Sequence, residues 1–422
     1  MLQPGSKNWI DKYLDLCEKG KIELSNIPYD SEGSSFLHAR LFQTGLAFGY
    51  PSKFLYLKDP VKSDNWTVNE RLVVLLFESL LHVYKLEKKQ LDSSEFMLSL
   101  MQFYKDYQEQ SSFNIFRFFS KESESEKLER ILAQRVHVKR TWTNLIWVNY
   151  LNNSLIFLDV LAYRQFLLSG NSLEGTYDRY ADAVLKTIIL ASYADGRIDP
   201  QEKTLYDVFI SSANLSPDLK KVISKASKEG TIRISDINLP DVTDELLAYY
   251  LIDIAVLTVF SDLEAMDDEV MFLYELCNYL GVDTDYLHQT MALVEIFVIE
   301  NNHKISFLQE NSSYERLYRS FSKRWIKVLG RNKDQLVEEL KQNKELLALF
   351  NKSIVKELSP TEKEQMKSQF KDLIKSMPSL AIFMLPGGAL LLPIILRIIP
   401  DLLPSSFRHN QLKDKEDKDE KD

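Results

Sequence analysis

Residues 67–84, TVNERLVVLLFESLLHVY, are the stretch that decides the fold class of this chain. Leucine, valine and phenylalanine recur at the three-to-four-residue spacing of a helix, which predicts a helix from Val68 to Tyr84. Thr67 and Glu70 have the spacing of a capping box, in which a threonine oxygen and a glutamate satisfy free amides of the first turn. Similar patterns fill most of the chain, which has only 13 glycines in 422 residues. The sequence therefore predicts an all-α protein built from multi-helix bundles.

The first predicted domain, residues 1–118, contains a second helix start of the same kind at Asp92–Glu95. Aromatic side chains follow it, and such residues are more often buried in a core than used to bind a ligand. We therefore expect core positions for Phe96, Phe103, Tyr104, Phe113 and Phe116.

Residues 119–171 are predicted to form a charged connector followed by a buried helix. KESESEKLER, residues 121–130, has the charge density of an exposed connector. The uncharged run 141–158 is long enough for a membrane span, but its four asparagines would each bury an amide in lipid. We favour a helix buried in protein, with a solvated basic cluster at its start: Arg135, His137, Lys139 and Arg140.

A two-helix unit occurs twice in the third predicted domain, residues 172–310. It spans AVLKTIILASYADGRIDPQEKTLYDVFISSANL at 183–215 and LIDIAVLTVFSDLEAMDDEVMFLYELCNYLGVD at 251–283. In each unit an apolar helix leads into an acidic turn and a second apolar helix. The domain resembles the TerB-like helical domain, whose hallmark is an Asp-Gly turn, here Asp195-Gly196, followed by an acidic residue in the next helix. Leu263 replaces the glycine in the second unit.

The carboxylates of these two turns have two interpretations. They would supply the several oxygen ligands that a divalent cation needs, and such a cation is the only cofactor the sequence suggests. Alternatively, Asp199 caps the next helix, with Pro200 at its first position. We favour capping, and keep as tentative metal ligands Asp195, Asp199, Glu202, Asp262 and Glu269.

Residues 311–357 are predicted to form a basic amphipathic helical connector. In ERLYRSFSKRWIKVLGRNK, residues 315–333, basic and apolar side chains are interspersed. This helix either packs on its neighbours with its charges in solvent or lies at a membrane surface, with Trp325 at the level of the lipid headgroups. Both interpretations stay open.

The most apolar stretch is SMPSLAIFMLPGGALLLPIIL, residues 376–396, which carries no charge over twenty-one residues. As a helix it would extend roughly 30 Å, the thickness of the hydrocarbon core of a bilayer. Pro386, Pro393 and Pro400 recur every seven residues and would bend a helix repeatedly to one side. Gly387 and Gly388 would permit close approach between helices. The pattern predicts a proline-kinked membrane segment.

Positive charges flank this segment and indicate a topology. Lys371 and Lys375 precede it and Arg397 follows it, so we expect these residues at the membrane interface. The excess of lysine before the segment favours a cytoplasmic position for the N-terminal bulk. Cys17 and Cys277 form no CxxC motif, which fits a reducing compartment.

Residues 358–407 resemble the membrane region of the Letm family, the leucine-zipper and EF-hand transmembrane proteins of the mitochondrial inner membrane. The shared features are a helix opened by Leu358 and Ser359, a proline-containing apolar segment, and a closing motif that includes Leu403, Pro404 and Phe407. The resemblance implies a role in cation homeostasis or cation/proton exchange. In the family a domain likened to ribosome-binding folds follows the membrane segment. Here residues 408–422 are a charged tail that we expect to be disordered, so a ribosome partner would bind the residues before the segment.

The combination of TerB-like and Letm-like parts resembles bacterial Letm-related, biofilm-associated proteins. We therefore expect a location in the bacterial inner membrane, with a cytoplasmic location as the alternative. No motif for a catalytic nucleophile, a nucleotide or a zinc-dependent base is present, so we expect no enzyme activity. The net charge of −9 argues against DNA binding. Two hypotheses remain. One is an oligomeric membrane protein in contact with lipid, and the other is a soluble or peripheral scaffold that binds protein or ribosomal partners and whose apolar segment packs on its own helices.

Overall fold

A computed structural model of the chain provides the structure. It describes residues 2–24, 38, 41–42, 44–57, 66–89, 91–105, 123–137, 153–170, 173–196, 200–212, 215, 217–237, 245–259, 267–284, 286–288, 290–291, 293–294, 338, 342–355, 359, 361–362, 365–366 and 369. Every regular element among these residues is a helix, which confirms the predicted all-α class.

The chain divides into two compact units. Unit 1 comprises Met1–Leu287 and Asn301–Asn311, and unit 2 comprises His288–Glu300 and Ser312–Asp422. The N-terminal part of unit 1 contains α1 (Trp9–Glu18), the short 3-10 helix η1 (Leu46–Phe48), α3 (Val68–Lys88), α4 (Ser93–Phe103), α6 (Glu124–Val136) and α7 (Phe157–Ser169). It continues with α8 (Leu173–Ser192), α9 (Pro200–Ser212), α10 (Pro217–Glu229), the 3-10 helix η5 (Ile234–Asp236), α11 (Glu245–Val259) and α12 (Asp267–Leu280).

Helix α3 is the buried centre of the N-terminal part, as its sequence predicts. The hydroxyl of Thr67 accepts a hydrogen bond from the amide of Glu70 at 3.2 Å, and the Glu70 carboxylate accepts one from the Thr67 amide at 2.7 Å. The predicted capping box is therefore confirmed. All residues of the helix from Leu72 to Tyr84 are buried, and the helix packs against α6, α7 and η1.

The second predicted start, at Asp92, is half of a capping box. The Asp92 carboxylate accepts from the amides of Ser94 and Glu95 at 2.8 and 3.0 Å. The Glu95 side chain instead accepts from the hydroxyl of Tyr84 at 3.4 Å. Phe96, Phe103 and Tyr104 are fully buried, which confirms their core positions; Phe113 and Phe116 lie outside the described residues.

The charged run at residues 121–130 is not an exposed connector. Its residues from Glu124 onward begin α6, and the Ser123 hydroxyl and the Glu126 carboxylate cap this helix in a second reciprocal box. Apolar residues at helical spacing, Leu128, Ile131 and Leu132, are fully buried. The prediction was wrong because the high charge of the run hid this apolar stripe.

The solvated basic cluster is also corrected in part. Arg135 is buried rather than solvated, with 7% of its surface exposed. His137 is exposed, and Lys139 and Arg140 lie outside the described residues, as does most of the run 141–158. The described end of that run, from Ser154 to Leu158, is fully buried in unit 1.

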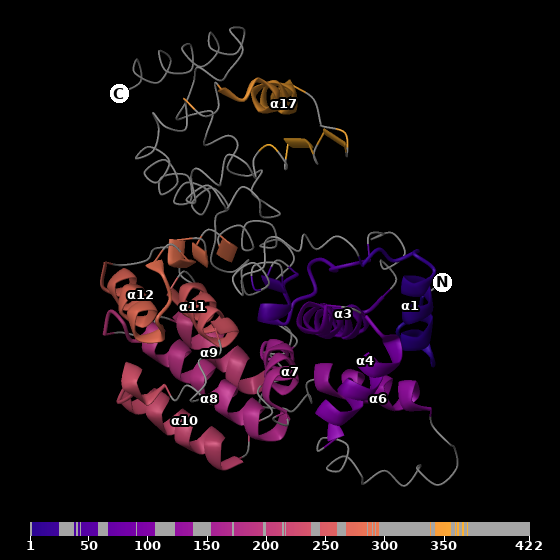
Figure 1. The fold of residues 1–422 in the computed structure, drawn as a ribbon. Coiled ribbons are helices and arrows are strands. Elements are labelled where there is room, and N and C mark those ends of the chain that lie inside the picture. The colour runs from indigo at the N-terminus through magenta and orange to yellow at the C-terminus, as the bar shows by residue number, and fades with distance from the viewer. Residues whose placement is uncertain are drawn as a thin grey trace. The chain divides into compact units, whose positions relative to one another are not determined.

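Helix α7 joins the two parts of unit 1, because it packs against α3 and against α8 (Figure 1). Helix α8 in turn packs against α9, α10 and α11. The pairs α8–α9 and α11–α12 are the two helix pairs of the predicted repeat. The boundaries at residues 118, 171 and 310 remain predictions.

Unit 2 is described mainly by α17 (Lys344–Val355) and a few residues beyond it. Ser359 and Glu362 form reciprocal bonds, amide to carboxylate at 3.0 Å and amide to hydroxyl at 3.3 Å, as the sequence predicts for a helix start. The side chain of Glu362 also pairs with Lys352 on α17. Helix α17 is therefore tied to the beginning of the Letm-like region.

Among the described residues, no helix has both the length and the apolar character needed to cross a bilayer. The predicted membrane segment 376–396, with its proline kinks, and the tail 408–422 lie outside these residues.

Candidate functional site

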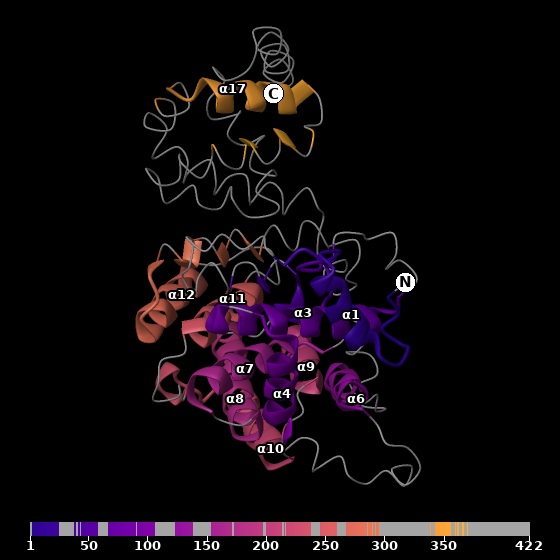
Figure 2. The same ribbon diagram turned by 45° about the vertical axis from the view of Figure 1, so that its right-hand side comes forward.

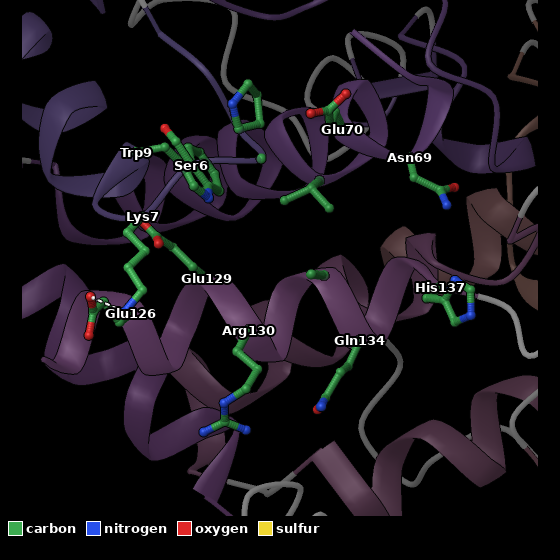
Figure 3. A pocket seen from close by; sticks show the side chains of 14 residues that line it. Ser6, Lys7, Trp9, Asn69, Glu70, Glu126, Glu129, Arg130, Gln134 and His137 are labelled. Carbon is green, nitrogen blue, oxygen red and sulfur yellow. Dashed lines mark ion pairs between the residues drawn. The ribbon is translucent and has the colours of Figure 1, made fainter. Parts of the chain in front are cut away.

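A groove of about 790 Å³ lies between the N-terminal segment, the start of α3 and one side of α6 (Figure 3). Pro4, Trp9, Val73 and Ala133 contribute its apolar surface. Its charged and polar side chains come mostly from the two helices. They include Glu70 and Asn69 on α3, and Glu126, Glu129, Arg130 and Gln134 on α6, with His137 at its end.

Glu129 holds the N-terminal segment against α6. Its two carboxylate oxygens accept hydrogen bonds from the amides of Asn8 at 3.1 Å and Ile10 at 3.0 Å. These amides belong to the first turn of α1, where backbone donors are free and the helix dipole favours an anion. Asn8 itself has φ +61° and makes no side-chain cap, so Glu129 caps α1 from another helix.

Burial raises the pKa of Glu129, although the bonds from the α1 amides act in the opposite direction. At the rim, the ammonium of Lys7 lies 3.4 Å from the carboxylate of Glu126, an ion pair marked in Figure 3. The side chain of Lys7 is 77% exposed, so this pair lies in solvent and contributes little to stability.

The N-terminal segment passes very close to the α3 cap. A Cβ atom at Gly5 would lie 2.6 Å from a carboxylate oxygen of Glu70. A side chain at residue 5 would therefore require the carboxylate of Glu70 to shift.

The carboxylates of the groove have structural roles. Two of its carboxylates are engaged in capping α1 and α3, and the third, Glu126, caps α6 and pairs with Lys7. The side-chain oxygen of Gln134, one of the residues that line the groove, is buried and makes no hydrogen bond. Ligands that donate a hydrogen bond would satisfy this oxygen.

The tentative metal ligands are only partly described. Asp195 is exposed in the turn after α8, and Glu269 is 4% exposed on α12. Asp199 and Asp262 lie outside the described residues, and the side chain of Glu202 is not described. Within the described part of the chain, no group of three or more His, Cys, Asp or Glu side chains is placed to hold a metal ion. The five-carboxylate site therefore stays a prediction.

The described part of the first turn contains a left-handed glycine and a helix start. Gly196 has φ +82°, a left-handed conformation that favours glycine, and its amide donates to the carbonyl of Tyr193 at 2.9 Å. Helix α9 begins at Pro200, the position predicted for it. The predicted cap residue, Asp199, lies outside the described residues.

The predicted membrane and interface residues also fall outside the described part of the chain. They are Trp325, Lys371, Lys375, Pro386, Gly387, Gly388, Pro393, Arg397, Pro400, Leu403, Pro404 and Phe407.

Three buried polar clusters were not expected from the sequence. The Glu78 carboxylate accepts from the hydroxyl of Tyr13 at 2.7 Å and from the backbone amides of residues 55–57 at 2.7 to 3.3 Å. Arg135 donates to both oxygens of Asp159, at 2.8 and 2.5 Å. His38 pairs with Asp253, both fully buried.

Burial raises the pKa of Glu78 to about 7, while its hydrogen bonds from Tyr13 and the three amides act to lower it. Four hydrogen-bond donors around one buried carboxylate form an anion-binding site, and the side chain of Glu78 occupies it. A capping motif can be recognised within four residues, but these clusters join residues from 21 to 215 positions apart. A single sequence contains no signal for such pairings.

Comparisons with known proteins place one part of the chain. Residues 358–422 match the family model described as LETM1-like, RBD. No curated protein and no solved structure matches the chain significantly. The C-terminal region is thus Letm-like, in agreement with the resemblance of residues 358–407.

Proposed function

We propose that this protein is a non-enzymatic, membrane-associated Letm-like protein that contributes to cation homeostasis or cation/proton exchange as an oligomer. The observation that carries the proposal is the overlap of two features near the C-terminus. The LETM1-like match covers residues 358–422, and the uncharged twenty-one-residue run 376–396 lies within it. A run of this length is sufficient to span the hydrocarbon core.

An oligomer is part of the proposal because one such segment cannot enclose a path for ions. The only polar side chains between residues 376 and 396 are Ser376 and Ser379, whereas an ion must exchange its hydration shell for protein ligands. Several copies would bring backbone carbonyls opened by proline to a shared axis, and Gly387 and Gly388 would permit the close approach.

Alkaline carbonate extraction tests the membrane association. The full chain and a version ending at Lys375 are expressed in the same bacterial host, and their membranes are washed at high pH. The full chain is expected in the pellet and the shorter chain in the supernatant. Release of both chains would overturn the proposal.

The transport part of the proposal needs its own test. Cross-linking in membranes is expected to trap oligomers of the full chain, and deletion of residues 376–407 is expected to change cation flux in vesicles. Cross-linking that yields only monomer, or a flux that deletion leaves unchanged, would remove this part and leave the membrane association standing.

A second candidate function is a peripheral scaffold that binds protein or ribosomal partners in the cytoplasm. The groove between residues 4–9, α3 and α6 favours it, because the groove combines apolar walls with an unsatisfied acceptor on Gln134. The full chain would then appear in the soluble fraction and sediment with ribosomes. Replacement of Gln134 by leucine, which removes the acceptor, would weaken the interaction, whereas the same change at the exposed Gln102 would not.

A further inference from the structure

We propose that helix α10 of unit 1 is a docking surface for an anionic lipid bilayer. This inference deepens the proposed membrane association, because it assigns a second, peripheral contact to the helical unit. Its argument uses only the described residues of α10, Pro217–Glu229, and their charges.

Helix α10 lies on the outside of unit 1 in both views (Figures 1 and 2). It packs mainly against α8, and Ile223, which is 1% exposed, points into the unit. The opposite side of the helix is in solvent. One apolar contact side is therefore sufficient to hold α10, and its outer side has no packing role.

The outer side combines positive charge with an exposed apolar side chain. Lys221 and Lys225 are one helical turn apart, and Val222 precedes Lys225 by three residues, so the three side chains share one side of the helix. Val222 is 62% exposed, the largest exposed fraction among the large hydrophobic residues of the described chain. Apolar side chains among lysines are typical of helices that lie at the surface of a bilayer.

Lys220 adds a second observation. Partial burial lowers the pKa of its ammonium group, and no carboxylate contributes to the shift. Within the described residues no ion pair of Lys220 is found, while Lys221 lies 3.9 Å from Asp218, a pair almost entirely in solvent. Lys220 precedes the buried Ile223 by three residues, so it lies at the edge of the contact side rather than beside Val222. A partly desolvated cation loses less hydration on contact with an external anion than a fully solvated one does.

The chemistry of this surface favours phospholipid over nucleic acid. A nucleic acid would offer phosphates to the lysines but no apolar layer to Val222. A bilayer offers anionic headgroups to the lysines and an apolar layer to Val222 at the same time. Anchoring at the C-terminus would raise the local concentration of α10 at the bilayer.

A probe at residue 222 tests the contact in the full chain. Val222→Cys is labelled with a fluorophore that shifts to the blue in an apolar environment. Selective labelling is practical because burial raises the pKa of both native thiols, Cys17 and Cys277, to about 12, which keeps them protonated and slow to react. Leu168→Cys on α7, where the side chain is 59% exposed, provides the matched control.

The labelled chains are placed in discs of neutral phosphatidylcholine or of phosphatidylcholine with phosphatidylglycerol. The expected result is a blue shift at residue 222 only in the anionic discs, lost at high salt, and no shift at residue 168. Lys220→Gln, Lys221→Gln and Lys225→Gln together should abolish the shift. If the chain binds vesicles without inserting, the same triple change should weaken binding on the order of 100-fold, at about fivefold for each charge.

The outcomes separate this inference from the proposed function. Carbonate resistance without a shift at residue 222 would overturn the α10 contact and leave the membrane association intact. A shift at 222 together with carbonate release would support α10 and overturn the integral segment. A shift produced by RNA or an acidic protein in solution, but by no anionic disc, would overturn the assignment to lipid.

Discussion

The sharpest stability prediction concerns Arg135, which the structure places inside unit 1. Its guanidinium is bidentate on Asp159, and the hydroxyl of Tyr104 donates to the same carboxylate at 2.9 Å. The guanidinium also lies 4.8 Å from the ring centroid of Tyr177. Burial acts to lower the pKa of Arg135, but the charge and hydrogen bonds of Asp159 outweigh it and raise the pKa above its usual value. The guanidinium of Arg135 is therefore charged.

Replacement of Arg135 by methionine should lower the free energy of unfolding by about 3–5 kcal/mol, the usual cost of removing one partner of a buried ion pair. The side chains of Arg135 and Asp159 are 6% and 0% exposed, so water cannot take the place of the lost partner. Tyr104 would remain as a donor to Asp159, but a single neutral donor does not balance a buried charge. Loss of the contact with Tyr177 would add about 1 kcal/mol.

If the loss arises from the buried carboxylate of Asp159 left without its partner, removal of both charged groups should reverse part of it. Arg135→Met combined with Asp159→Leu and Tyr104→Phe removes the charges and the donors of this cluster together, and should recover at least half of the loss, about 2 kcal/mol.

Urea unfolding of the full chain, followed by near-ultraviolet circular dichroism, gives the free energies. The matched control is Lys19→Met, which breaks a pair whose side chains are 59% and 49% exposed and should cost under about 1 kcal/mol. A loss below about 1 kcal/mol for Arg135→Met, or a triple variant less stable than the single one, would refute the reasoning.

Three further predictions follow from single positions. The pKa of Glu78 is raised to about 7 in the folded protein, from 4.5 in the unfolded chain, so the free energy of unfolding should fall by about 3 kcal/mol as the pH rises from 4.5 to 7. Glu78→Gln should remove this fall, which urea midpoints measured from pH 5 to 8 can show. Gly49 has φ +69°, and a Cβ atom there would lie 2.1 Å from the carbonyl oxygen of Asn153. Gly170 has φ +76° but no atom within 4 Å, so Gly49→Ala should cost roughly 2 kcal/mol more stability than Gly170→Ala. Equal melting temperatures of the two variants would contradict this. Thr67→Ala should cost about 1 kcal/mol by loss of the α3 cap, and Thr67→Ser should restore it, as thermal unfolding can show.

The features predicted correctly from the sequence are local ones. The caps at Thr67, Asp92 and Ser359, the Asp-Gly turn at Gly196 and the helix start at Pro200 each depend on residues within four positions of one another. Helical spacing of apolar residues is equally local, and it is sufficient for the all-α class. Such signals act before any tertiary contact forms, so they can be identified from one sequence.

The errors have a common physical origin, because in each a charged residue was assigned to solvent. The run that begins α6 is rich in glutamate and lysine, yet Glu129 is used to cap α1, a helix 119 residues away. Arg135 is basic, yet it can be buried because it is paired with Asp159, which lies 24 residues later in the chain. A charged side chain needs either water or a protein partner, and which of the two it has depends on the tertiary structure.

The same long-range pairs bear on how unit 1 is organised. His38 and Asp253 are both fully buried and lie 215 residues apart, in the first and third of the predicted domains. The hydroxyl of Tyr250, also buried, donates to the carbonyl of Ala47 at 3.0 Å, so it joins the same two parts of the chain. A fragment cut between them would remove His38 from Asp253 and the Ala47 carbonyl from the hydroxyl of Tyr250, so that Asp253 would keep Tyr286 and Tyr250 would keep the carbonyl of Ser154. Each buried interaction that is lost costs free energy. The first and third predicted domains are therefore expected to fold as one cooperative unit rather than as two independent domains.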